Sequence, residues 1–127
     1  MSSALAPGMW LAVAAGAVLG AWGRWLLALA LNRTGQLLPV GTLVANVAGG
    51  LLIGLALAWF ERRPDIALAW RPFAVTGFLG ALTTFSTFSA ESLLMIQRGA
   101  WGSAVLHSVA HLAGSLLAAA VGYRLLR

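Results

Sequence analysis

Four long apolar segments follow one another along the chain, separated by short polar stretches. They run from about Leu11 to Leu31, from Pro39 to Phe60, from Pro72 to Gln97 and from Trp101 to Tyr123. A helix needs about 20 apolar residues to cross a hydrocarbon core of about 30 Å, and each segment is long enough. The alternation typical of outer-membrane barrel strands is absent from the sequence. The pattern therefore predicts an all-α membrane protein, with one four-helix transmembrane domain over residues 1–127.

The connections between these segments are short. We expect loops at Asn32–Leu38, Glu61–Arg71 and Arg98–Ala100, which leave no room for a soluble domain. The first segment lacks a basic leader and continues past the length of a signal peptide, so we expect a retained helix. Aromatic residues lie near the segment ends, as in the aromatic belts of membrane proteins: Trp10, Trp59, Trp70, Trp101 and Tyr123.

Composition and charge agree with this interpretation. The chain is 61% hydrophobic and 9% charged, whereas a soluble domain carries about 25% charged residues. Its eight arginines are scattered, mostly flank apolar segments and form no patch, so we expect a lipid bilayer and no nucleic acid as partner. With four spans, Arg62, Arg63, Arg71, Arg124 and Arg127 share one side, which favours cytoplasmic termini. Without cysteine, the chain has no thiolate metal ligand and no disulfide.

Two polar residues stand inside the first two segments. Ala12, Gly16, Gly20 and Arg24 recur at a spacing of four and form a smooth helical stripe, of the kind that lets membrane helices approach closely. An arginine at this depth is either functional or reaches to the headgroups, and the residues alone leave both open. In the second segment, Thr42 and Asn46 share a face, where Asn46 either joins helices or contacts a solute.

The third segment carries more polarity than a simple span requires. Residues 77–91 read GFLGALTTFSTFSAE, with two glycines, five hydroxyls and a carboxylate. Hydroxyls can bond to carbonyls one turn back and bend or open a helix, so we expect a break in this helix. A break exposes carbonyls, which membranes tolerate where they face protein, water or an ion. Phe85 and Phe88 lie three apart, a spacing that is usually just core packing.

The fourth segment places His107, His111 and Ser115 at a spacing of four. We expect a polar stripe that lines a wet pathway or bonds to a neighbouring helix. A zinc site is not favoured, because no third ligand stands beside the histidines in sequence and the HExxH carboxylate is missing. Across the four spans, donors outnumber carboxylates and only Glu91 is available. This inventory suits an anion better than a cation or proton relay, and no constellation for an enzyme can be assembled.

The stretches GTLVANVAGG and GFLGALTTFSTFSAE, with the surroundings of Gly20–Trp25, resemble the Fluc (CrcB) family of fluoride channels over essentially the whole chain. The resemblance implies a multi-pass protein of the bacterial inner (plasma) membrane. It also implies an antiparallel, dual-topology homodimer with a broken third helix. Two fluoride pores would lie between the subunits, with a structural sodium ion at their centre. Dual insertion favours a near balance of charge, whereas five arginines here stand on one side and two on the other.

Residue roles follow from the same resemblance. Asn46 would donate to fluoride, Phe85 and Phe88 would present their ring edges to it, and Thr42 would support Asn46. Gly80 and Thr83 would offer main-chain carbonyls to sodium. Ser115, together with His107 and His111, would continue the polar track, although the family pattern leads us to expect tyrosine at 107 and a hydroxyl at 111. Arg24 would belong to a positive vestibule, and Glu91 would hold a structural hydrogen bond.

Two alternatives remain open at this point. A small proton-coupled multidrug exporter has a similar size, but it requires an acid within the first helix, where this chain has Arg24. A non-transporting assembly subunit would use the glycine stripes for docking. It would have no need of Asn46 and the two phenylalanines.

Overall fold

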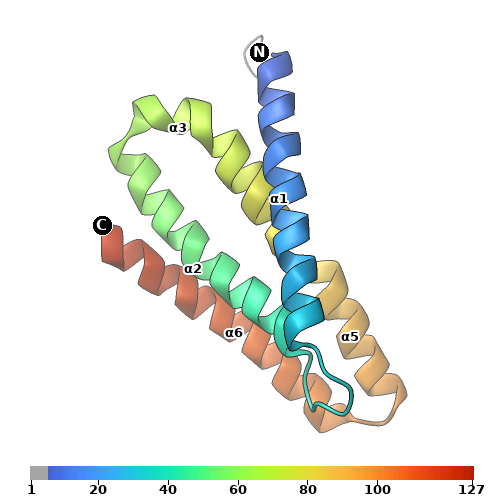
Figure 1. Cartoon of the computed structure of the whole chain (residues 1–127). Coiled ribbons are helices and arrows are strands. Elements are labelled where there is room, and N and C mark those ends of the chain that lie inside the picture. The colour runs from blue at the N-terminus through green and yellow to red at the C-terminus, as the bar shows by residue number, and fades with distance from the viewer. Residues whose placement is uncertain (1–5) are drawn as a thin grey trace.

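The computed structural model describes residues 6–127, and it is all-helical (Figure 1). The elements are α1 (Pro7–Leu31), α2 (Val40–Arg62), α3 (Pro64–Arg71), η1 (Pro72–Leu79), α4 (Gly80–Leu82), α5 (Phe85–Gln97) and α6 (Trp101–Leu126). Four helical stretches are long and apolar enough to cross a membrane: Pro7–Leu31, Val40–Arg62, Pro64–Gln97 and Trp101–Leu126. The predicted all-helical, four-span character is confirmed.

The prediction of a loop at Glu61–Arg71 is wrong. Only Arg63, with φ −132° and ψ 65°, interrupts the helical conformation between α2 and α3. Pro64 then stands in the first turn of α3, where its missing N–H costs no hydrogen bond. Asp65 in the same turn favourably faces the positive end of the helix dipole. These two residues turn the polar stretch into a helix that runs directly into η1.

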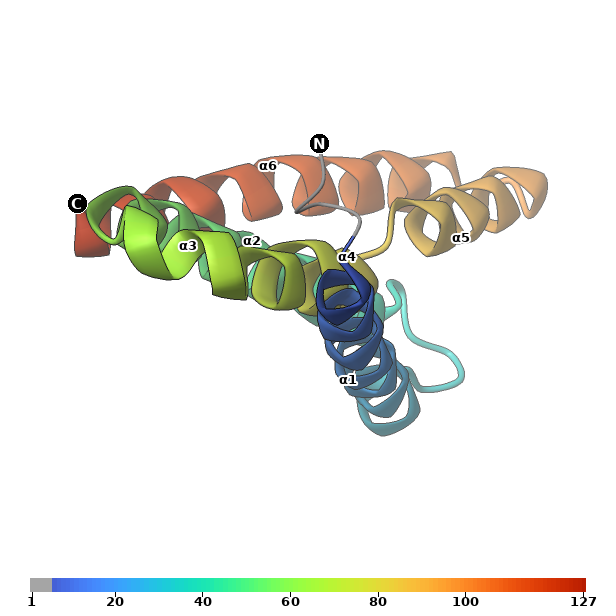
Figure 2. The ribbon, with the colours of Figure 1, turned by 90° about the horizontal axis from the view of Figure 1, so that it is seen from above.

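Two close helix contacts organise the molecule (Figures 1 and 2). The helices α2 and α6 run side by side, and their backbones approach so closely that only glycine fits at the contact. A Cβ at Gly54 would overlap the carbonyl oxygen of Ala119. On the other side, α1 packs against η1 and α4, where a Cβ at Gly20 would overlap the carbonyl oxygen of Phe78. In a lipid bilayer, close approach of two helix backbones at small residues is a main source of helix association. The predicted small-residue stripe of the first segment therefore forms a helix contact.

The third span changes conformation twice along its length. In η1 the helix is of the π type, with the Gly80 N–H donating to the Val75 carbonyl. After α4, Thr83 (φ −84°, ψ 152°) and Thr84 (φ −150°, ψ 119°) are extended, and α5 begins at Phe85. The side chain of Thr84 accepts a hydrogen bond from the Thr87 N–H and so caps α5. Residues 83–84, called the hinge below, thus separate two helical parts.

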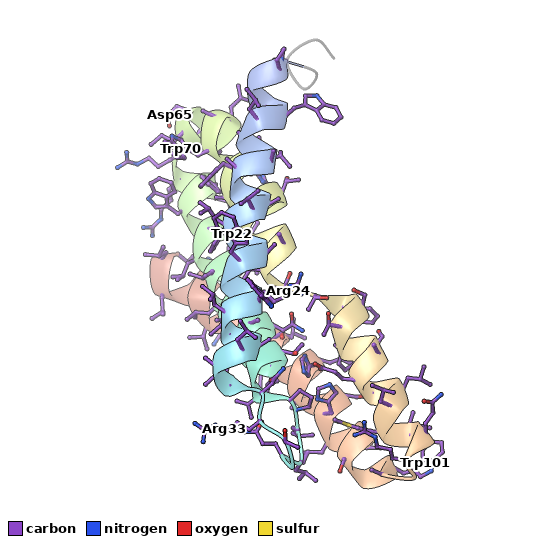
Figure 3. All side chains as sticks on the ribbon, turned by 45° about the vertical axis from the view of Figure 1, so that its right-hand side comes forward. Trp22, Arg24, Arg33, Asp65, Trp70 and Trp101 are labelled. Atoms are coloured by element: carbon purple, nitrogen blue, oxygen red, sulfur yellow. The ribbon has the colours of Figure 1, made fainter. Side chains whose placement is uncertain are left out.

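The buried core is small, and large apolar side chains cover the outside. Trp22, Trp70 and Trp101 are 60%, 57% and 63% exposed and project outward (Figure 3). Exposed apolar surface on this scale indicates contact with lipid or with another protein. The outer faces of α1, α2, α5 and α6 are therefore suited to a bilayer.

Candidate functional site

Asn46 on α2 holds the hinge of the third span. Its Oδ1 accepts the Thr84 N–H at 2.7 Å, and its Nδ2 donates to the Thr84 carbonyl at 3.0 Å. One side-chain amide therefore satisfies both backbone groups that the extended conformation of Thr84 takes out of the helical ladder. This pair of bonds also determines which end of the Asn46 amide is oxygen and which is nitrogen.

The second amide hydrogen of Asn46 is also in use. Nδ2 lies 2.9 Å from Nδ1 of His111 on α6. Because this Nδ2 can only donate, Nδ1 of His111 accepts and the neutral ring carries its proton on Nε2. Asn46 was predicted to donate to an ion, and the structure shows both of its donors bound within the same chain.

Two carbonyls near the hinge lose their usual helical partners. In a continuous helix the Gly80 carbonyl accepts from the Thr84 N–H, which here donates to Asn46. Likewise, the Thr83 carbonyl would accept from the Thr87 N–H, which here donates to the Thr84 hydroxyl. The oxygens of Gly80 and Thr83, both predicted ion ligands, are thus released by the local fold.

Other polar side chains bond to carbonyls around the same break. Arg24 on α1 is half-buried, and its Nε donates to the Ala81 carbonyl at 3.1 Å. The Thr83 hydroxyl donates to the Leu79 carbonyl at 2.9 Å, and Ser89 donates to Phe85 at 2.8 Å. The prediction that hydroxyls would bond one turn back is confirmed for both. Arg24 therefore has a structural partner at the end of α4.

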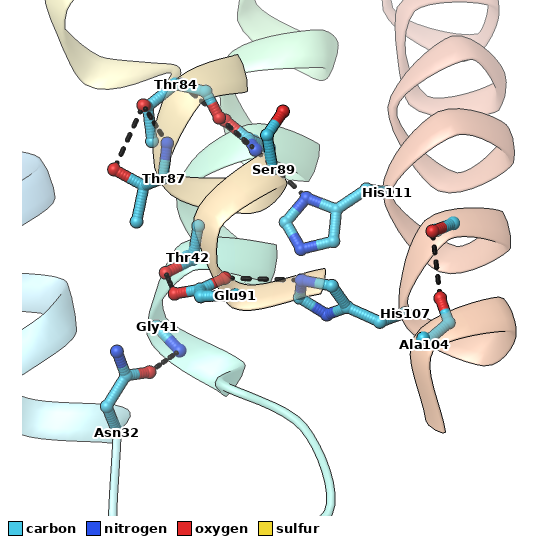
Figure 4. A network of polar contacts seen from close by, with 12 residues as sticks. Asn32, Gly41, Thr42, Thr84, Thr87, Ser89, Glu91, Ala104, His107 and His111 are labelled. Carbon is cyan, nitrogen blue, oxygen red and sulfur yellow. Dashed lines mark hydrogen bonds and ion pairs between the residues drawn. The ribbon is translucent and has the colours of Figure 1, made fainter. Parts of the chain in front are cut away.

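Glu91 on α5 joins α2 to α6 (Figure 4). The hydroxyl of buried Thr42 donates to its Oε1 at 2.6 Å. Its Oε2 lies 3.2 Å from Nε2 of His107, at ion-pair distance but without the alignment of a hydrogen bond. Thr42, predicted to support the Asn46 region, donates its hydroxyl hydrogen to Glu91 in this structure. The third carboxylate of the sequence thus lies beside the first histidine of α6.

The two phenylalanines of the third span lie in different environments. Phe88 is buried, and its ring lies 5.4 Å and 4.9 Å from the rings of His107 and His111. Phe85 is 72% exposed, with its ring centre 5.3 Å from that of Phe88 in an edge-on arrangement. Phe88 therefore belongs to the interior of the folded chain, whereas Phe85 lies at its surface.

A cavity of about 560 Å³ borders these groups. Its polar lining comes from the hinge and the two facing helices: Asn46, Thr83, Thr84, His111 and Ser115. Phe85 and Phe88 complete that side, and the lining residues include no Asp, Glu, Lys or Arg. The cavity thus brings together most of the residues that the sequence singled out, with Thr42, Arg24, Glu91 and His107 outside its wall.

A family model described as "CrcB-like protein, Camphor Resistance (CrcB)" matches residues 11–123. The chain belongs to the CrcB family. Curated CrcB relatives named "Fluoride-specific ion channel FluC" align over most of their length. The protein of Aromatoleum aromaticum is 56% identical over 113 residues, 89% of this chain and 86% of its own. That of Cupriavidus pinatubonensis is 53% identical over 118 residues, 91% and 94% of the two chains. That of Acinetobacter baumannii is 49% identical over 112 residues, 88% of each.

Two features of this CrcB chain were missed by sequence reasoning. The role of the Thr84 backbone as the partner of Asn46 was not foreseen, although the paired hydroxyls at 83 and 84 signal an end and a new start of a helix. The approach of Glu91 to the histidines was missed because it joins segments that are distant in sequence. The roles predicted for the individual residues of the site stay predictions.

Proposed function

We propose that this chain is a fluoride-selective channel that lets fluoride leave the cell down its electrochemical gradient. Relatives named "Fluoride-specific ion channel FluC", about half identical over nearly the whole chain, support fluoride as the ion. The observation that carries the proposal for this chain is the cavity at the hinge. Its wall combines amide, hydroxyl, imidazole and aromatic groups with no carboxylate among its lining residues.

The chemistry of this wall suits a small anion. Fluoride holds its hydration shell tightly, so a pathway must supply directed donors in place of water. The amide of Asn46 and the hydroxyls of Thr84 and Ser115 are such donors. The rings of Phe85 and Phe88 carry a positive edge that can contact an anion without holding it strongly. Carboxylates, which a cation pathway would require, are missing from the lining residues.

We further propose that the working unit is an antiparallel homodimer with its pores between the subunits. Phe85 supports this idea because it is 72% exposed while the ring of its neighbour Phe88 is buried. A second subunit over this face would enclose Phe85 and close the open side of the cavity. The break in the third span would then stand at the subunit boundary, in a multi-pass protein of the bacterial inner membrane.

A sodium ion fits the released carbonyls of Gly80 and Thr83. Alkali cations prefer oxygen ligands, and rings of backbone carbonyls replace their hydration shells. Both oxygens lack their helical N–H partners because Thr84 and Thr87 donate elsewhere. When bound between two subunits, the ion would offset the electrostatic cost of those carbonyls in a low-dielectric region. The chain itself supplies the hinge that orients them.

Fluoride would engage Asn46 by exchange of hydrogen bonds. The two bonds between Asn46 and Thr84 reinforce each other, whereas the third, to His111, joins two movable side chains. When the His111 ring moves aside, the Asn46 N–H directed at it becomes available to an arriving anion, while both bonds to Thr84 stay in place. Such an exchange keeps binding weak enough for release, as conduction requires.

A small proton-coupled multidrug exporter is not supported. Its mechanism needs a membrane-embedded acid on the first helix, and α1 carries Arg24 as its charged residue within the described chain. If the chain were a non-transporting assembly subunit, the polar wall of the cavity would have no function. We therefore retain the channel as the single proposed function.

The proposal is tested by fluoride efflux from liposomes that contain the purified chain. We expect rapid fluoride release and essentially no chloride release. Phe85→Ile removes a ring edge and Asn46→Asp introduces a negative charge, so each should lower fluoride flux by at least about tenfold (about 1.4 kcal/mol). Phe73→Ile is the matched control, because Phe73 packs edge-on against Trp70 and lies outside the cavity lining; it should conduct normally.

Three results would contradict this proposal. Chloride flux of the same size as fluoride flux would show that the pathway is not selective for fluoride. Full flux in both pore variants would show that the pathway lies elsewhere. Absence of any flux in a folded, reconstituted wild-type protein would show that the chain is not a channel.

A further inference from the structure

Three metal-ligating side chains converge between α5 and α6, away from the proposed sodium ligands. They are Glu91, His107 and His111, whose ligand atoms all lie within 4.8 Å of one another. Figure 4 shows the carboxylate and the two imidazoles facing the same small region. His107 is fully buried and His111 is 4% exposed. We call this group the Glu-His-His cluster.

Most polar atoms of the cluster have no hydrogen-bond partner. These atoms are both ring nitrogens of His107, Nε2 of His111 and Oε2 of Glu91. A buried polar group without a partner costs about 1–3 kcal/mol. Oε2 of Glu91 and Nε2 of His107 have only each other, at 3.2 Å and poorly aligned, whereas Nδ1 of His107 and Nε2 of His111 have no partner. Packing alone does not explain such a group, because polar groups in folded proteins are almost always satisfied. The cluster therefore has the character of a ligand site.

We propose that the Glu-His-His cluster binds a divalent transition-metal ion of the zinc type. Two histidines and one glutamate are a donor set that zinc uses, with bonds of about 2.0–2.2 Å and a fourth position left open. Tetrahedral geometry at these bond lengths separates neighbouring ligand atoms by about 3.3 Å. Nε2 of His107 and Oε2 of Glu91 are already 3.2 Å apart. All three ligand atoms lie within 4.8 Å of one another, so a small approach of the side chains completes the set.

The surroundings of the cluster resemble those of a prepared metal site. Thr42 donates to Oε1 of Glu91 at 2.6 Å and so turns Oε2 toward the histidines. The ring of Phe88 is stacked on the His107 imidazole and tilted against that of His111, and it supplies an apolar wall. Hydrogen bonds to the metal ligands and an apolar surrounding are the features that orient and strengthen such ligands. The proposal goes beyond the fluoride pathway and does not depend on it.

Asn46 sets the proton arrangement of the third ligand. Because its Nδ2 donates to Nδ1 of His111, the proton of that neutral ring is on Nε2. For Nε2 to bind a metal, this proton must move to Nδ1, and the His111 ring must move away from the Asn46 amide, which its two bonds to Thr84 hold in place. The ring keeps one proton throughout, so the step balances. A carboxylate at position 46 would accept the Nδ1 proton and favour the metal-binding form.

The test is a cobalt titration of the purified, tag-free full-length chain, followed by the visible absorption of tetrahedral cobalt and reversed by zinc. The sequence has only two histidines and no cysteine, so imidazole ligation can come from nowhere else in it. We expect one ion per chain. His107→Gln, His111→Gln and Glu91→Gln should each weaken binding at least about tenfold, whereas Asp65→Asn, a control at an exposed carboxylate, should not change it.

Asn46→Asp gives a test of opposite sign. It should tighten cobalt binding several-fold, because it favours the proton on Nδ1 of His111. Helical content and elution volume establish that each variant is folded. A folded wild-type protein without the tetrahedral spectrum overturns the proposal, and this result needs no variant. A spectrum that survives the double His107→Gln, His111→Gln change also overturns it.

Discussion

Replacing Asn46 by alanine removes the support of the hinge without touching the helices on either side. The Thr84 N–H then loses its 2.7 Å bond to Oδ1, and the Thr84 carbonyl loses its 3.0 Å bond to Nδ2. Loss of one buried backbone bond costs about 1–3 kcal/mol. That energy corresponds to an amide that opens to solvent about 5 to 150 times more often. Asn46→Asp keeps an acceptor for the Thr84 N–H while losing both donors.

The assay is amide hydrogen exchange at Thr84 in detergent or nanodiscs. We expect fast exchange of this amide in Asn46→Ala and wild-type-like exchange in Asn46→Asp. Ser108→Ala is the control: it deletes the 2.8 Å bond to the Ala104 carbonyl on α6 and leaves the hinge intact. Equal protection of Thr84 in the alanine variant and the wild type would refute the assignment of Asn46 as the support of the hinge.

Two further predictions concern stability. Gly54→Ala should lower the free energy of unfolding by about 1–3 kcal/mol, because the new methyl group meets the Ala119 carbonyl across the α2–α6 contact; Gly102→Ala, where nothing lies within 4 Å, should not destabilise. Chemical denaturation measures both, and equal stabilities would argue against the close approach. Arg24→Leu should cost about 1–2 kcal/mol in the same assay, since the Ala81 carbonyl loses a charged donor at 3.1 Å; an unchanged midpoint would show that this bond contributes nothing.

The sequence determines the class of this protein because membrane insertion depends on local quantities. Segment length and apolar content decide whether a helix can cross the bilayer, and all four spans were predicted on that basis. The hydroxyl-rich run of residues 77–91 also indicated irregular backbone, since competing side-chain bonds act within one turn. The error at residues 61–71 is local as well: Pro64 and Asp65 favour a helix start that composition alone hides.

The tertiary structure decided which polar groups meet. Glu91 reaches Thr42 on α2 and approaches His107 on α6, and sequence periodicity says only which face of its own helix it occupies. For the same reason a metal site was not favoured from sequence: its third ligand comes from another helix. The hydrogen bonds of Asn46 likewise depend on how closely glycines let α2 approach its neighbours. The periodicity of a sequence shows which residues share one face of a helix. Which other helix that face contacts is determined by how the helix backbones pack against each other.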